Sequence, residues 1–242
     1  MPIPRSLCLA LTLLASLPGQ GAVPYLEIGA GRRQGDFGTS VRSDLWLGYA
    51  SLGCAGERWD SSLTVPFLSL QRTGPGVSRQ DWGLGDVVVQ SGWRFLPETW
   101  DGWSLDGLGA LKCPTANQNR DLGTGRADLG TFLALNQRLG LLRWSLLGGW
   151  IQGVSGHAGG DLTPGAYAFS AATSLALDSA RWELVFEARG PAFQGEPGAR
   201  EVSLNLSRSL SPVWGVKASA MAGFTAASPK WSVGLALVRS FP

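Results

Sequence analysis

The sequence predicts an all-β protein: a single transmembrane, antiparallel up-and-down β-barrel of about 12 strands, preceded by a cleaved signal peptide. Three observations support this fold class. Apolar and polar residues alternate along most of the chain, short and long connections alternate between these segments, and aromatic residues gather near the segment ends. A chain of 242 residues is long enough for one large β domain.

The first 22 residues have the pattern of an export signal. Arg5 supplies a positive charge, residues 7–17 form an apolar run, and small residues follow up to Ala22. The apolar run is too short to remain as a membrane-spanning helix. We therefore expect residues 1–22 to be the signal peptide and residues 23–242 to form the barrel.

Composition argues against several other classes of protein. The formal net charge is only +2 and is spread evenly, which gives no basis for a nucleic-acid partner. After removal of the signal peptide, Cys54 and Cys113 remain, and the strand layout places them at opposite ends of the barrel, so we expect them to be unpaired. One histidine and two separated cysteines cannot build a metal cluster, and no cofactor is expected.

Twelve segments show strand-like alternation, each separated from the next by turn residues. In one of them, Trp182 and Phe186 share a face, whereas Glu183 and Glu187 share the opposite face. A soluble sandwich would bury the apolar face, but a membrane barrel turns it toward lipid. The predicted strands are residues 24–32, 39–51, 58–71, 83–95, 102–112, 126–138, 142–153, 163–177, 181–189, 200–208, 213–224 and 230–241.

The connections follow the plan of an outer-membrane barrel. Short or moderate segments such as "LGLL" and "DSA" alternate with longer polar ones such as "RTGPGVSRQDW" and "CPTANQNRDLGTGR". An even number of strands, with both termini and the short turns at the periplasmic side, is typical of this class. We therefore expect the long loops to be extracellular.

Aromatic residues distinguish a membrane barrel from a soluble sandwich. A soluble core favours large rings in the middle of strands, whereas a bilayer favours two aromatic belts around an aliphatic waist. The sequence predicts two belts, and hence a location in the bacterial outer membrane. On the outward parity, the belt near the short turns comprises Tyr49, Trp59, Trp93, Phe95, Trp103, Trp144, Trp182, Trp214 and Phe241, and the belt near the long loops comprises Phe67, Trp150, Tyr167, Phe169, Phe224 and Trp231.

The opposite parity predicts a charged lumen. These side chains either brace the interior through ion pairs and hydrogen bonds or line a solute pathway. Barrels of eight strands are filled by their own side chains, and barrels of sixteen strands enclose an aqueous channel. A barrel of twelve strands lies between these cases, and its lumen is either a narrow pore or plugged. The predicted luminal residues are Arg42, Asp44, Asp86, Arg94, Asp106, Lys112, Asp128, Asn136, Arg143, Glu183, Glu187, Glu201, Asn205 and Lys217.

One part of the sequence is more specific. Pro66 precedes Gly-Leu-Gly-Asp at residues 83–86, followed by Lys-x-Pro-Thr at 112–115 and Leu-Gly-Thr-Gly at 122–125, with Asp128 three residues later. This pattern resembles a family of bacterial outer-membrane barrels described as transporter-like proteins of the phenol-degradation meta-pathway. The resemblance implies uptake of small hydrophobic or aromatic compounds.

The residues of these motifs also predict a local contact. Lys112, Asp86 and Asp128 fall at the same end of neighbouring strands, so we expect Lys112 to pair with Asp86 or Asp128 near the extracellular mouth. The cluster serves either as a structural clamp for the loop or as a contact for a solute.

We therefore expect a non-enzymatic channel for passive uptake of small solutes, with outer-membrane lipid, a small-molecule solute and the barrel-assembly machinery as partners. The alternative is a barrel that transports nothing and acts as a scaffold or partner of an envelope complex, with Trp82 and Phe193 as loop anchors. An enzyme is least expected. The sole histidine, His157, lies near Ser155 and Asp161 on a Gly-rich segment that does not preorganise a catalytic site.

Overall fold

The computed structural model describes residues 22–37, 39–99, 101–154, 165–190 and 198–241. The predicted signal peptide lies, except for Ala22, outside this part. The described residues contain one short 3-10 helix, η1 (Gln118–Arg120), and none of their helices is long and apolar enough to cross a membrane. The remaining regular structure is β-sheet.

The described part of the chain contains thirteen strands, all antiparallel to their neighbours. They are β1 (Val23–Gly35), β2 (Arg42–Ala55), β3 (Trp59–Gly74), β4 (Val77–Leu84), β5 (Val87–Leu96), β6 (Trp103–Cys113), β7 (Ala127–Leu139), β8 (Leu142–Val154), β9 (Ala166–Leu177), β10 (Ala180–Arg189), β11 (Ala199–Ser209), β12 (Trp214–Gly223) and β13 (Trp231–Ser240).

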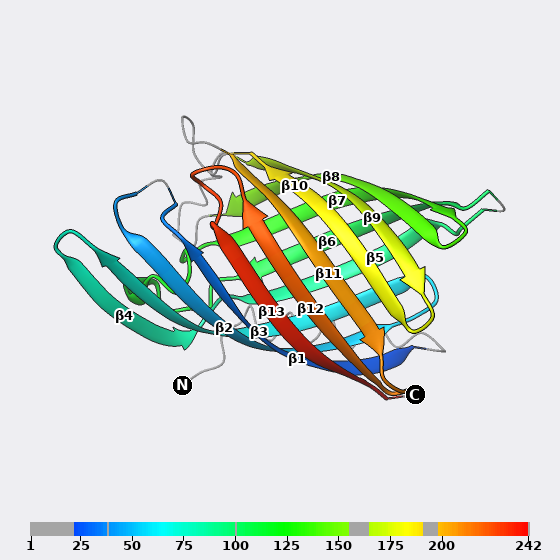
Figure 1. The fold of residues 1–242 in the computed structure, drawn as a ribbon, viewed down its shortest axis with the longest axis horizontal. Helices are drawn as coiled ribbons and strands as arrows, with labels where there is room; N and C mark the ends of the chain where they lie inside the picture. Colours follow the sequence, from blue (N-terminus) through cyan, green and yellow to red (C-terminus); the bar gives the residue numbers. More distant parts are fainter. Residues whose placement is uncertain (1–21, 38, 100, 155–164, 191–197, 242) are drawn as a thin grey trace.

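Twelve of these strands close into a barrel, as the sequence predicts. β1 pairs with β2 on one side and with β13 on the other, in a register that joins Tyr25 to Ser240 and Gln34 to Trp231. The other barrel strands pair in chain order, except that β3 pairs with β5 across the inserted strand β4 (Figure 1). Closure removes the free edges that would otherwise leave backbone groups unpaired in lipid.

The inserted strand β4 corrects the prediction of a loop at this position. β3 continues past the barrel and turns back through Pro75 and Gly76, whose φ of +71° suits the third position of a type II turn. β4 then pairs with the C-terminal half of β3, and this hairpin projects beyond the barrel in Figure 1. The predicted strand 83–95 is therefore divided, and β5 begins only at Val87.

The strand register separates a luminal face from an outer face, because directly paired residues of antiparallel strands share a face. Glu27 lies on the luminal face and contacts Lys217 from β12 at 2.6 Å. On the other face, Leu235 is 70% exposed, and the described residues with buried side chains include Asp86 and Glu201. The apolar residues thus point out and many charged residues point in, which is the arrangement of a membrane barrel.

The two aromatic belts are confirmed with one correction. Trp93, Trp182 and Trp231 are on the outer face by register, as are the other predicted belt residues in β-strands except Tyr49. Tyr49 pairs with Gly29 and points into the lumen, where its hydroxyl donates to Glu27 at 2.7 Å. Trp46, on the opposite parity of β2, is the aromatic residue of this strand that lies on the outer face.

The short connections lie at one end of the barrel, as predicted. β7 and β8 are joined by Gly140 and Leu141 alone, and Gly140 has a φ of +63°. Glycine is favoured there because other residues rarely adopt this conformation. The end that carries residues 114–126, which connect β6 and β7, is called the mouth below.

The two cysteines in the described part of the chain, Cys54 and Cys113, are free. Cys54 lies near the short-turn end of β2, and Cys113 ends β6 at the mouth, where it is buried with Leu63 and Val87. The prediction that they are unpaired and lie at opposite ends is confirmed.

Candidate functional site: the lumen and its mouth

Most of the predicted luminal residues lie on the luminal face. The register places them there on seven strands, β5 to β8 and β10 to β12, together with the residue that precedes β5. The set comprises Asp86, Arg94, Asp106, Lys112, Asp128, Asn136, Arg143, Glu183, Glu187, Glu201, Asn205 and Lys217.

Arg42 and Asp44 do not face the lumen, and this corrects the prediction. Asp44 pairs with Gln34 on the outer face and forms an ion pair with Arg32, whose guanidinium lies 5.1 Å from the ring centroid of Trp46. β2 has apolar residues on both faces, so the rule that the apolar parity points outward selected the wrong face. The luminal face of β2 carries leucines and Tyr49 instead.

The predicted cluster at the mouth is present. Lys112 forms an ion pair with Asp128, its Nζ lies 3.8 Å from Asp86, and it donates to the Thr124 hydroxyl at 2.7 Å. Asp86 in turn accepts backbone N–H groups from Ala116 at 3.1 Å and Thr124 at 3.4 Å. The cluster therefore joins three strand ends to the β6–β7 loop and acts as a clamp.

The same loop is fastened to the β3–β4 hairpin. Asp121 accepts from Arg72 at 2.7 Å, the carbonyl of Asn119 accepts from Arg79 at 3.0 Å, and Arg120 donates to the carbonyl of Trp82 at 3.2 Å. Arg72 and Arg79 are on the luminal face of the hairpin. The loop thus covers this face, at the mouth.

A chain of hydrogen bonds crosses four strands nearer the short-turn end. Arg94 donates to Asp106 at 2.9 Å, Asn136 donates to the same carboxylate at 3.0 Å, and Ser145 donates to Asn136 at 2.7 Å. Each of these residues comes from a successive strand, β5 to β8. The chain braces the wall, because every charged member has a partner.

The wall formed by β10 and β11 is also charged. Arg189 contacts Glu187 at 3.2 Å and Glu201 at 3.3 Å, and Arg181 lies 3.8 Å from Glu183. Sequence reasoning missed both arginines as luminal residues. The signal was present, because both share the parity of Glu183 and Glu187 in β10.

Further luminal residues that were missed include Glu27, Arg33, Asp60 and Tyr49. For Glu27 and Arg33, the alternation of β1 with Leu26 and Ile28 was the available signal. No sequence signal marks the contact of Glu27 with Lys217, which are 190 residues apart.

An apolar patch lies on β6 to β8, between the cluster at the mouth and the hydrogen-bond chain nearer the short-turn end. A cavity of about 350 Å³ is lined there by Leu108, Phe132, Leu147 and Ile151, among others. A Cβ atom at Gly149 would lie 2.3 Å from the Phe132 ring, so the ring lies flat over a glycine. The lumen therefore has an apolar patch in the middle of β6 to β8, with charged residues of the same strands above and below it and with Glu187 and Arg189 at its border.

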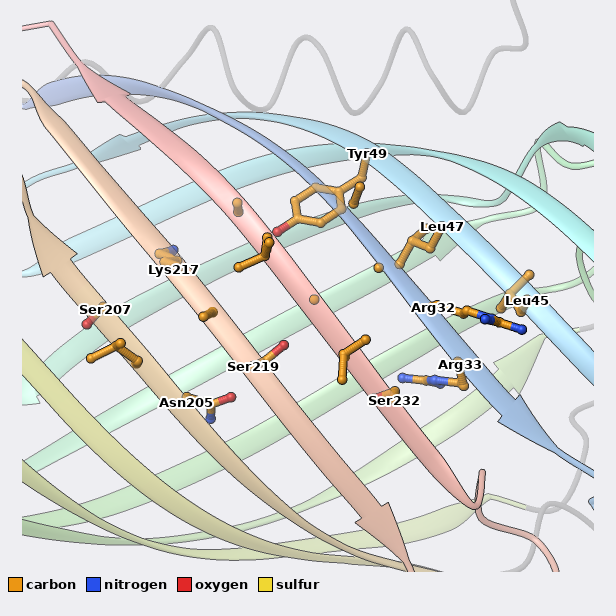
Figure 2. A pocket seen from close by; sticks show the side chains of 18 of the residues that line it. Arg32, Arg33, Leu45, Leu47, Tyr49, Asn205, Ser207, Lys217, Ser219 and Ser232 are labelled. Atoms are coloured by element: carbon orange, nitrogen blue, oxygen red, sulfur yellow. The ribbon is translucent and has the colours of Figure 1, made fainter.

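Neighbouring luminal cavities share lining residues. The apolar cavity shares Asp60, Leu108 and Leu147 with a second cavity of about 600 Å³, which reaches toward the short-turn end. This second cavity shares Glu183 with a third, also about 600 Å³, which lies behind β11 to β13 and β1 to β2 (Figure 2). Open space thus extends across and along the lumen.

Two predictions concern residues for which the structure gives no answer. Ser155, His157 and Asp161, weighed as a catalytic group, and Phe193, weighed as an anchor, lie outside the described residues. Trp82 is described, and it lies on the outer face of β4 with 60% of its surface exposed. In the described part of the chain, no group of three His, Cys, Asp or Glu side chains could hold a metal ion.

These features define the class of protein. A closed twelve-stranded barrel with an apolar exterior, aromatic belts and a charged interior is an outer-membrane β-barrel, and its architecture is porin-like. Its location is the outer membrane.

Solved structures of outer-membrane proteins share this fold. The chain is similar to the COG4313 outer membrane channel from Pseudomonas putida F1, with a TM-score of 0.71 and 15% identity, covering 93% of this chain and 97% of that one. It is also similar to the KdgM porin (TM-score 0.56, 9% identity, 91% and 99% covered) and the NanC porin (TM-score 0.55, 11% identity, 90% and 99% covered). No family model and no curated protein sequence matches the chain. The likeness is therefore one of fold.

Proposed function

We propose that this protein is a channel for passive passage of small, mainly hydrophobic or aromatic solutes across the outer membrane. The observation that carries the proposal is the series of luminal cavities that share Asp60, Leu108, Leu147 and Glu183. A lumen packed by its own side chains, as in small barrels, would not leave a series of neighbouring cavities.

The apolar patch supports the class of solute. Phe132 and its aliphatic neighbours offer an apolar surface, while Glu187 and Arg189 at the border of the same cavity satisfy each other. A solute with an apolar face can lie on the patch without breaking an ion pair. We propose that the luminal residues identified above, from Asp86 to Lys217, line this pathway. The resemblance to the phenol-degradation transporter-like barrels supports the same class of solute.

The proposal includes no chemical step and no cofactor. The three solved structures named above are channels and porins rather than enzymes. The partners we propose are the outer-membrane lipid that surrounds the apolar exterior, the solute, and the barrel-assembly machinery during biogenesis.

A pair of neighbouring substitutions on β9 tests passage directly. Ala172 is luminal and lines the middle cavity, whereas Ala171 is on the outer face beside Phe186. A tryptophan at position 172 narrows the lumen, and the same ring at position 171 enters lipid. We expect liposomes with the Ala172→Trp variant to swell more slowly in small neutral solutes than those with wild type, and Ala171→Trp to match wild type.

The rival role is a scaffold without transport. The observation that favours it is the exposed pair Phe67 and Trp82 on the projecting hairpin, with ring centroids 6.1 Å apart, because exposed aromatic side chains are common anchors for partners. If wild-type protein causes no faster swelling than empty liposomes, and Ala172→Trp and Ala171→Trp do not differ, the channel is wrong and the scaffold is favoured.

A further inference from the structure

The third luminal cavity, of about 600 Å³ and lined by β1 to β3 and β10 to β13, has two unlike walls. Leu45 and Leu47 of β2 and Leu68 of β3 form an apolar wall. The facing wall, on β11 to β13, is polar (Figure 2). Its side chains are Asn205, Ser207, Ser219 and Ser232.

Arg33 of β1 lies between these walls with its guanidinium unoccupied. Its neighbour across the β1–β13 pairing is Ser232, and the two lie side by side in Figure 2. Within the described residues, the Arg33 side chain makes no hydrogen bond and no ion pair, and the same holds for the four polar side chains of the facing wall. The cavity therefore offers unused hydrogen-bond donors beside an apolar surface.

The other cations around the cavity are occupied. Lys217 contacts Glu27 at 2.6 Å, and Arg181 donates to Ser174 at 3.0 Å. Glu187 and Glu201 attract the Arg33 guanidinium electrostatically without contacting it, and both of these carboxylates contact Arg189 instead. Arg33 is thus the cation in this cavity whose N–H groups are available to a solute.

We propose that this cavity is a binding site for a small organic acid with an apolar body, which rests on the proposed channel function and narrows its class of solute. The carboxylate accepts two N–H groups from Arg33, and the apolar body lies on Leu45, Leu47 and Leu68. A volume of about 600 Å³ is within the range of small-molecule sites.

The charges favour an anion over other solutes. Lys217 is paired with Glu27 and Arg181 lies 3.8 Å from Glu183, so the charge of Arg33 remains, and it repels a cation. A neutral arene would leave the guanidinium unused. An aromatic carboxylate uses both walls, so benzoate and its neutral isostere benzamide are suitable probes.

The test measures binding of the two probes to the folded full-length barrel in detergent, by saturation-transfer NMR titration against protein-free micelles. We expect wild type to bind benzoate more tightly than benzamide, and added salt to weaken only benzoate. The Arg33→Gln variant should lower benzoate affinity roughly fivefold and leave benzamide unchanged, because an ion pair in contact with water has modest strength. Arg33→Lys, which keeps the charge, should retain part of the preference.

Two further variants serve as controls. Arg42→Gln removes the same charge from the outer face and should leave both affinities unchanged. Leu47→Ala should lower both affinities equally, because it affects the apolar wall alone. The proposal is wrong if Arg33→Gln retains the preference of wild type for benzoate, or if Arg42→Gln lowers it as much.

The two proposals fail in distinguishable ways. If neither probe enters proteoliposomes faster than empty ones but benzoate binding still depends on Arg33, the channel is wrong and the site stands. If both probes enter and binding does not depend on Arg33 in either the Gln or the Lys variant, the site is wrong and the channel stands.

Discussion

The two ends of the barrel are held together by different means. At the short-turn end, β7–β8 and β9–β10 are joined by two residues each, and Gly140 and Asp178 adopt positive φ values of 63° and 47°. These turns are local, and neighbouring residues determine them. At the mouth, the β6–β7 loop is fixed by Asp86 and Arg72, which come from other parts of the chain.

This difference indicates where passage can be controlled without unfolding the barrel. The loop lies over the luminal face of the β3–β4 hairpin and is held by polar contacts. Such contacts are individually weak and sensitive to salt where water reaches them. A change within the loop itself should therefore open the loop, whereas a change at a strand end or in the ladder of the barrel wall should affect the whole fold.

The largest effect is expected for Asp86→Ala. The Asp86 side chain is 8% exposed, and its loss leaves the N–H groups of Ala116 and Thr124 without their acceptor. We expect the free energy of unfolding to fall by about 2–4 kcal/mol. Urea titration in detergent, followed by the shift of the folded band on unheated gels, measures this.

The control for Asp86→Ala is Glu57→Ala, because Glu57 is exposed in the β2–β3 turn at the opposite end. This variant should unfold like wild type. Equal loss of stability in the two variants would contradict the role of the clamp.

A smaller effect is expected for Gly123→Ala, which tests the clamp by sterics. A Cβ atom at Gly123 would lie 2.6 Å from a carboxylate oxygen of Asp86, so the loop must shift. We expect a cost of about 1–3 kcal/mol, concentrated in the loop. Trypsin should then cleave after Arg120 roughly ten times faster, while the barrel stays folded.

Gly48→Ala is the matched control, because Gly48 is on the outer face and a Cβ atom there would meet nothing within 4 Å. Its rate of cleavage after Arg120 should equal that of wild type. Unchanged cleavage in Gly123→Ala would mean that the loop does not depend on Asp86.

The sequence predicts a strand well where its two faces differ in chemistry. β10 has Trp182 and Phe186 on one side and Glu183 and Glu187 on the other, and each lies on the predicted face. β2 has apolar residues on both sides, so alternation alone could not assign its faces. The wrong choice moved Arg42, Asp44 and Tyr49 together, because a shift of one residue exchanges every side chain between the faces.

The contacts that build the site were harder to predict. The pairing of Lys112 with Asp128 could be anticipated because both lie at the same end of adjacent strands. The pairing of Glu27 with Lys217 depends on closure of the barrel between β1 and β13, which brings together the two ends of the sequence. β4 was missed because its strand signal lay inside a polar, Gly- and Pro-containing segment.

Phe132→Ala tests the apolar patch, which lies on the same strands as the clamp, β6 and β7, but farther from the mouth. Loss of the ring removes apolar surface and widens the passage. We expect the ratio of toluene-sized to glycerol-sized solute flux to fall roughly fivefold in proteoliposomes, because an aromatic solute loses about 1 kcal/mol of contact. Leu133→Ala, on the outer face with 55% exposure in wild type, should leave this ratio unchanged. Equal ratios for Phe132→Ala and wild type would show that solutes do not use the patch.

The smallest effect on stability is expected for Lys217→Gln. The Lys217 side chain is 51% exposed and its ion pair with Glu27 faces water, so we expect a loss of less than about 1 kcal/mol. Glu27 keeps the hydrogen bond from Tyr49 at 2.7 Å and retains its charge, so the lumen becomes more negative. The reversal potential across a planar bilayer in a salt gradient should shift toward cation selectivity. Lys230 of the β12–β13 connection forms a comparable exposed ion pair with Asp36 of the β1–β2 connection, and Lys230→Gln should shift the reversal potential less. If Lys217→Gln loses as much stability as Asp86→Ala, the short-turn end of the lumen, like the mouth, depends on its ion pairs for folding.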